Sequence, residues 1–240
     1  MGATMKDSEL LKQHEQSRQI LMQTINYSET QKALNKSYCF ITDISLCAQM
    51  IKEKREAKLF DLAIKEYQFS LFTLSQGMYR HAFSSLRLTL ELALSAIEFS
   101  ANEYSLRRWE SGLNDINWQR IINLENGIFS KNFANIFNVE VADRIEHYRK
   151  LAESVYRECS EYVHGNANTH LKLPSKIEFS EENVLSWADK SSTIHMIILF
   201  TYFLRYVGDL NAESKEQLSL TFNESLGHIP SIRITFGGQK

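Results

Sequence analysis

The segment YRECSEYVHGN, residues 156–166, holds the side chains best suited to chemistry in this sequence. Arg157 and His164 lie seven positions apart, and Gly165 follows the histidine directly. A guanidinium is a permanent cation, and an imidazole gains and loses a proton near neutral pH. Together the two groups could bind an anionic ligand and move a proton on it.

The residues around this pair show the most regular helical pattern in the chain. Apolar residues recur at alternating steps of four and three, which predicts one helix of about 24 residues over 141–164, packed along its length. The apolar stripe consists of Val141, Ile145, Tyr148, Ala152, Val155, Cys159 and Tyr162. Gly165 and Asn166 supply a C-terminal stop.

On such a helix Arg157 and His164 lie on one line, opposite the apolar stripe. They are two turns apart, about 10.5 Å along the axis, so the side chains would not touch each other directly. They could still bind one extended ligand between them.

A solvated helix face explains the same residues without any chemistry. Glu146 with Lys150, and Glu153 with Arg157, are acid-then-base pairs at i, i+4, which is the favourable order on an exposed helix. His164 in the last turn is favoured by the helix dipole alone. The sequence pattern leaves both interpretations open.

A second long helix is predicted upstream, in GMYRHAFSSLRLTLELALSAIEF, residues 77–99. Gly77 separates two apolar segments, as expected at a tight turn between antiparallel helices. After this turn, apolar residues recur at spacings of three and four, and Arg87, Glu91 and Glu98 share one polar line. We therefore expect this helix to be buried on most sides.

The rest of the chain also favours helices. Its two prolines, Pro174 and Pro230, lie late in the sequence, as expected if long helices dominate. The prediction is an all-α up-and-down bundle with long antiparallel helices: an N-terminal helical extension over 1–36, a helical domain over 37–210 and a weakly patterned C-terminal tail over 211–240. The apolar run 196–207 is shorter than the ~20 residues of a membrane span and contains Arg205, so we interpret it as a buried helix.

Composition narrows the classes of function and location. The 27 basic and 29 acidic residues give a formal charge of −2, so any attraction for nucleic acid or anionic membrane must be local. The wide spacing of Cys39, Cys47 and Cys159 argues against a disulfide framework or a zinc site, and no signal peptide is visible. We expect a cytoplasmic protein with no metal, no cofactor and no membrane association.

The pattern Arg157-x6-His164, near the end of a late helix in an all-α chain, resembles the HEPN superfamily (higher eukaryotes and prokaryotes nucleotide-binding). Glu158 stands where a polar residue often follows the motif arginine. Residues 77–99 are similar to the long helix that packs on the motif helix of such proteins, with Arg87 and Glu91 in its polar line. The resemblance covers roughly residues 60–210.

This resemblance implies a metal-independent endoribonuclease that acts as a toxin or antiviral effector and dimerises, so that two copies of the motif line one cleft. Arg157 and His164 would be the catalytic pair, with Glu158, Tyr162, Arg87 and Glu91 in support. Cleavage of RNA through its own 2′-hydroxyl needs a base and a fixed cation beside the phosphate. The expected partners are RNA and a second copy of the chain. The alternative is a non-catalytic helical binding or adaptor protein that regulates a protein partner.

Overall fold

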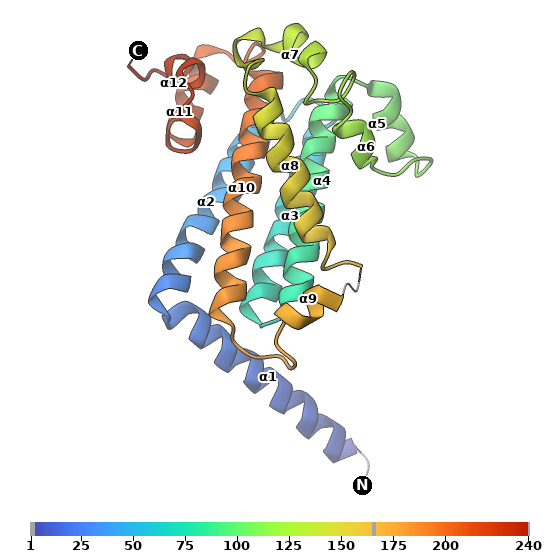
Figure 1. Cartoon of the computed structure of the whole chain (residues 1–240), viewed down its shortest axis with the longest axis vertical. Coiled ribbons are helices and arrows are strands. Elements are labelled where there is room, and N and C mark those ends of the chain that lie inside the picture. Colours follow the sequence, from blue (N-terminus) through green and yellow to red (C-terminus); the bar gives the residue numbers. More distant parts are fainter. Residues whose placement is uncertain (1–2, 165–166, 240) are drawn as a thin grey trace.

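Long helices build the protein, and successive ones run in opposite directions (Figure 1). The computed structural model describes residues 3–164 and 167–239, and these ranges contain no strand. The long helices of the bundle are α2 (Ser28–Met50), α3 (Ala57–Ser75), α4 (Tyr79–Ser100), α8 (Ile145–Ser160) and α10 (Glu181–Tyr206). The all-α bundle predicted from the sequence is confirmed.

Helix α10 lies inside the bundle, where it packs against α2, α4 and α8. Its C-terminal half is apolar on all sides, and nearly every residue from Ile197 to Tyr206 is buried. Ser180 caps the helix by accepting a hydrogen bond from the amide of Asn183 at 3.3 Å. The run 196–207 is therefore a buried helix, as predicted. Within the described ranges, no helix has the length and apolarity that a membrane span requires.

Gly77 closes the hairpin between α3 and α4. Its φ angle is +74°, which glycine adopts without strain. The amide of Gly77 donates to the carbonyl of Leu74 at 3.0 Å, and that of Met78 donates to Thr73 at 2.9 Å. These bonds form a Schellman motif, which satisfies carbonyl groups at the end of α3. The predicted tight turn is confirmed.

Replacement of Gly77 by alanine should destabilise the protein by about 1 kcal/mol or more, because a side chain at positive φ is strained. A Cβ atom at this position would also lie 3.1 Å from the carbonyl oxygen of Glu178. Urea denaturation of the wild type and of Gly77→Ala measures the difference in the free energy of unfolding. Gly208→Ala is the matched control, since a Cβ there meets nothing within 4 Å. An equal loss in both variants would contradict the prediction.

Helix α8 is shorter than the helix predicted over 141–164. The chain before it forms a 3-10 helix, η1 (Val139–Val141), and the chain after it turns at residues 161–164. In this turn the amides of Tyr162 and Val163 donate to carbonyls three residues back, at 3.2 and 3.0 Å, which is tighter than an α-helix. All seven predicted apolar positions, Val141 to Tyr162, are nevertheless buried. The predicted stop at 165–166 lies outside the described residues.

Short helices connect α4 to α8. They are α5 (Glu103–Glu110), α6 (Trp118–Ile121) and α7 (Lys131–Phe137). Arg120 on α6 pairs with Glu98 on α4 at 2.9 Å, and it also donates to the hydroxyl of Ser105 at 3.0 Å. These contacts hold α6 against the bundle, beside α8.

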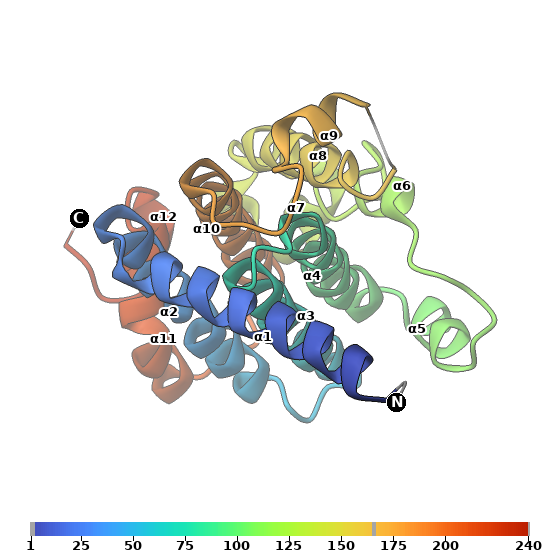
Figure 2. The ribbon, with the colours of Figure 1, turned by 90° about the horizontal axis from the view of Figure 1, so that it is seen from below.

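Both ends of the chain differ from the predicted boundaries. Helix α1 (Ala3–Asn26) crosses one end of the bundle (Figure 2), and α2 continues through the expected boundary at residue 36. Residues 211–239 are not a loose tail, because α11 (Ala212–Leu226) and α12 (Pro230–Thr235) pack on the core. Their buried apolar residues are Leu218, Phe222, Leu226, Ile232 and Phe236. This apolar stripe is spread over two short helices, which weakens its periodicity in the sequence.

Candidate functional site

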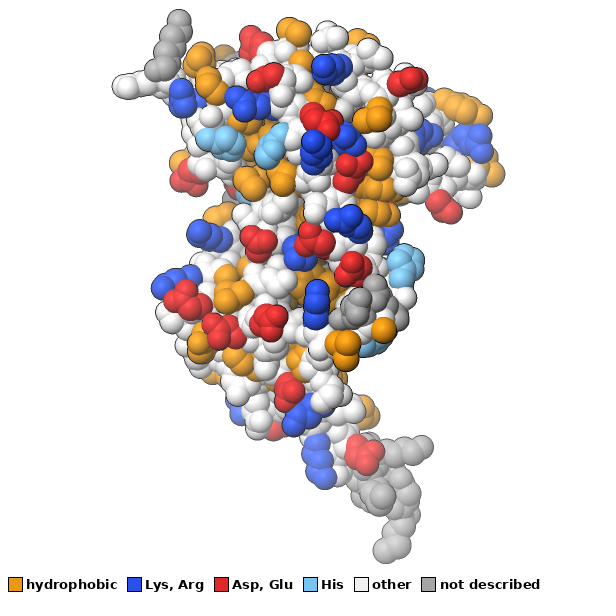
Figure 3. Space-filling view, viewed as in Figure 1, with side chains coloured by type: hydrophobic (Ala, Val, Ile, Leu, Met, Phe, Trp, Pro, Cys, Tyr) orange, Lys and Arg blue, Asp and Glu red, His pale blue; other side chains and the backbone are white. Residues whose placement is uncertain are grey.

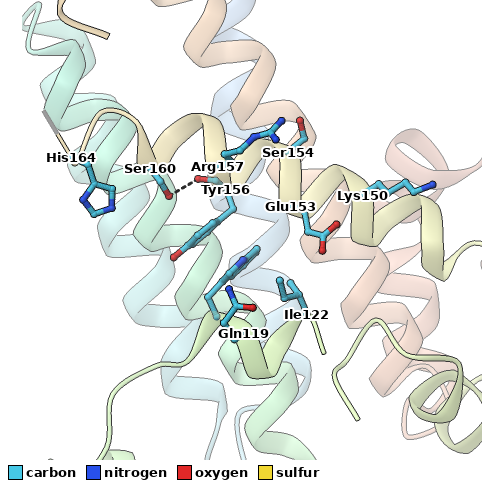
Figure 4. A pocket seen from close by; sticks show the side chains of 10 residues that line it. Gln119, Ile122, Lys150, Glu153, Ser154, Tyr156, Arg157, Ser160 and His164 are labelled. Carbon is cyan, nitrogen blue, oxygen red and sulfur yellow. Dashed lines mark hydrogen bonds between the residues drawn. The ribbon is translucent and has the colours of Figure 1, made fainter. Parts of the chain in front are cut away.

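An open groove of about 580 Å³ lies between α8 and the α6 segment (Figure 4). The α6 wall presents Trp118, Gln119 and Ile122. The α8 wall presents side chains opposite the buried stripe, namely Lys150, Glu153, Ser154, Tyr156, Arg157 and Ser160. His164, in the turn after α8, completes the lining.

Arg157 and His164 both line this groove. Their side chains do not point toward one another: the guanidinium lies alongside α8 near Ser154, and the imidazole lies beyond the end of the helix (Figure 4). Both side chains are exposed. One monomer therefore presents the two groups at separate places along the groove.

The ion pairs on α8 differ in part from the solvated-face interpretation. Lys150 pairs with Glu146 at 3.3 Å, as that interpretation predicts. Glu153, however, pairs with Arg149 at 2.6 Å and not with Arg157. Among the residues that the structure describes, none forms an ion pair or a side-chain hydrogen bond with Arg157. Its guanidinium is left available for an anionic ligand.

Arg80 on α4 fixes the turn that carries His164. Its guanidinium donates to the carbonyl oxygen of Tyr162 at 2.8 Å and to that of Val163 at 3.2 Å. A cation is favourable at this position because helix carbonyls without partners carry partial negative charge. The ring of Tyr162 is buried and stacks on Phe83 with centroids 4.0 Å apart. Tyr162, predicted to support the site, therefore lies in the core and outside the groove lining.

A half-buried network joins α4 to α8 beneath the groove. Arg87 pairs with Glu91 at 3.0 Å and donates to the hydroxyl of Tyr156, which in turn donates to Glu91 at 2.9 Å. Burial raises the pKa of the Glu91 carboxyl, although the charge of Arg87 and the bond from Tyr156 oppose this. Trp118 stacks on the Tyr156 ring with centroids 3.7 Å apart. The network fixes the floor of the groove, and Arg87 and Glu91 do not line it.

Glu158 also lies outside the groove lining. It pairs with Lys190 on α10 at 2.9 Å and accepts a hydrogen bond from Ser154 at 2.9 Å. Burial raises the pKa of the Glu158 carboxyl, but these two bonds together with the charges of Lys190 and Arg157 outweigh it, so the pKa lies below its ordinary value. The structure therefore gives Glu158 a role in holding α8 against α10.

Charge around the groove is mixed in sign. Basic and acidic side chains alternate on the face of the molecule shown in Figure 3, which is the face that carries α8. A strong general attraction for a polyanion is therefore not expected, and specific cations must provide it. Over residues 3–164 and 167–239, no three His, Cys, Asp or Glu side chains cluster in a way that could hold a metal ion.

Several residues of the groove were not identified as site residues from the sequence. Trp118 and Gln119 lie in a four-residue helix and Ile122 follows it, and the approach of this segment to α8 depends on the path of the connecting chain. The sequence offers a signal for Lys150 as a site residue, because Lys150 precedes Arg157 by the same seven residues that separate Arg157 from His164.

We found no significant match to models of protein families, to curated proteins or to solved structures.

Proposed function

We propose that this protein is a metal-independent endoribonuclease of HEPN type that acts in the cytoplasm as a toxin or antiviral effector. The observation that carries the proposal is the placement of Arg157 and His164 on one groove, with the guanidinium lacking a carboxylate partner among the described residues. A permanent cation and a proton acceptor on one groove are the groups that RNA cleavage requires.

In the proposed reaction the nucleophile belongs to the RNA. His164 removes the proton from the 2′-hydroxyl as its oxygen attacks the adjacent phosphorus atom. The bond from phosphorus to the 5′-oxygen breaks, and this oxygen receives the proton that His164 took, so the products are a 2′,3′-cyclic phosphate and a 5′-hydroxyl. Arg157 stabilises the added negative charge on the five-coordinate phosphate. The proton balance closes without water, and RNA supplies the nucleophile, so this route needs no metal.

A homodimer is part of the proposal. Arg157 and His164 of one chain point to different places (Figure 4), and the groove that they line is open. A second copy placed against this face would bring its own Arg157 and His164 to the same cleft. Each scissile phosphate could then meet a guanidinium from one chain and an imidazole from the other.

An adaptor role is the second candidate, and a different surface favours it. Leu62, Phe69 and Phe72 on α3 are exposed large apolar side chains, on a helix whose other side is buried in the bundle. Exposed apolar patches often mark protein interfaces. In this role Arg157 and His164 would be surface residues without a catalytic task.

Expression in growing cells tests the proposal. The wild-type protein should slow growth and degrade cellular RNA, whereas His164→Ala and Arg157→Ala should each restore growth at equal protein levels. This is expected because each substitution removes one of the two groups that the reaction needs. Equal growth with the wild type and both variants would contradict the nuclease proposal. A stable complex with a second protein in a pull-down would then support the adaptor.

A further inference from the structure

Three side chains that can carry positive charge line the groove and recur at equal intervals in the sequence. Lys150, Arg157 and His164 are separated by seven residues each, and all three line the groove. Seven residues of an α-helix fall about 20° short of two full turns, so Lys150 and Arg157 share one line along α8. Their positions differ by about 10.5 Å along the helix axis.

Lys150 is held only weakly by its present partner. Its side chain is 69% exposed, and its ion pair with Glu146 spans 3.3 Å at a surface where that carboxylate is 56% exposed. Exposed pairs of this kind contribute little to stability. Arg149 also pairs with Glu146, at 2.9 Å, so the carboxylate keeps a cation if Lys150 turns away. The ammonium group can therefore move to another anion at small cost.

We propose that Lys150 binds a second phosphate of the RNA strand whose scissile phosphate lies at Arg157. This inference rests on the proposed function, and it defines the substrate as single-stranded RNA longer than a dinucleotide. A stacked strand rises about 3.4 Å per nucleotide, so a separation of about 10.5 Å spans about three nucleotides. Unpaired bases of that stretch would face the α6 wall, where Trp118, Gln119 and Ile122 offer an aromatic edge, an amide and an apolar side chain.

Binding measurements test this role directly. The probe is a labelled 12-nucleotide single-stranded RNA of mixed sequence, measured by fluorescence anisotropy at several salt concentrations with the His164→Ala chain, which would leave the RNA intact. Adding Lys150→Gln should weaken binding about fivefold to tenfold at low salt, and it should reduce the slope of log affinity against log salt by about 0.7. A change in salt slope reports a lost phosphate contact, which a purely structural role would not produce.

Lys32→Gln is the matched control. Lys32 is 70% exposed and pairs at 3.0 Å with Glu29, which is 57% exposed. Both residues lie on a helix surface and are distant in sequence from the residues that line the groove. The control should keep both the affinity and the salt slope. If Lys150→Gln and Lys32→Gln bind the RNA equally well, with equal slopes, the assignment of Lys150 is wrong.

Cleavage measurements with His164 intact separate this inference from the function on which it rests. Lys150→Gln should raise the KM for the 12-nucleotide RNA several-fold with little change in kcat, whereas Lys32→Gln should change neither constant. One outcome would support the endoribonuclease but contradict the Lys150 site. In that outcome the wild type cleaves RNA, His164→Ala does not, and Lys150→Gln has the same KM as Lys32→Gln. If the wild type neither binds nor cleaves RNA, both proposals fail.

Discussion

Replacement of His164 by alanine should lower the rate of RNA cleavage by the purified protein by about 10²- to 10⁴-fold. The imidazole is the proposed base for the 2′-hydroxyl, and no other histidine lines the groove among the described residues. Replacement of Arg157 by alanine should lower the rate by about 10²- to 10³-fold, because it removes charge stabilisation of the transition state. The rates are measured with excess enzyme over a labelled RNA, in the presence of a metal chelator.

His170→Ala is the control for this experiment. His170 is an exposed histidine in α9 (Ala167–Lys172) and does not line the groove, so its loss should leave the rate unchanged. The exposed positions of His164 and Arg157 mean that neither alanine variant should unfold the protein. Circular dichroism checks that both variants remain folded. Equal rates for the wild type and for both site variants would rule out the catalytic pair.

Trp187→Ala should destabilise the protein by about 3 to 5 kcal/mol, the range observed when large aromatic residues are removed from a core. Trp187 on α10 is fully buried, and its indole N–H donates to the hydroxyl of Ser70 at 2.8 Å. Ser70 in turn donates to the carbonyl of Ala82 at 2.6 Å. The substitution therefore leaves a cavity and removes a bond that links α10 to α3. Urea denaturation measures the loss.

Two further variants make this prediction specific. Trp187→Phe fills most of the space and loses only the N–H group, so its loss of stability should be smaller than that of Trp187→Ala. Tyr104→Ala, at a residue that is 70% exposed, should change the free energy of unfolding by no more than about 0.5 kcal/mol. A loss for Trp187→Ala as small as that for Tyr104→Ala would show that this part of the core is loosely packed.

Periodicity predicted the helices and their buried faces well, where they are long. The stripe from Val141 to Tyr162 is buried throughout, although only residues 145–160 form the α-helix. The stripe persists because the tight turn after Ser160 continues to direct Tyr162 into the core, where it stacks on Phe83. The burial pattern was therefore more predictable than the helix ends, which depend on local bonds such as those from Arg80.

The sequence alone determined that this chain forms long antiparallel helices and that Arg157 lies opposite the buried stripe, because a period of 3.6 residues fixes which side chains share a face. His164 lies in the turn after α8, where that period no longer applies. The acid-then-base order favoured a pair of Glu153 with Arg157, although Arg149 also lies four residues from Glu153. In the tertiary structure Glu153 pairs with Arg149. The tertiary structure also brings Trp118 against Tyr156, which forms the second wall of the groove. Such contacts depend on how distant segments pack, and local periodicity carries no information about that.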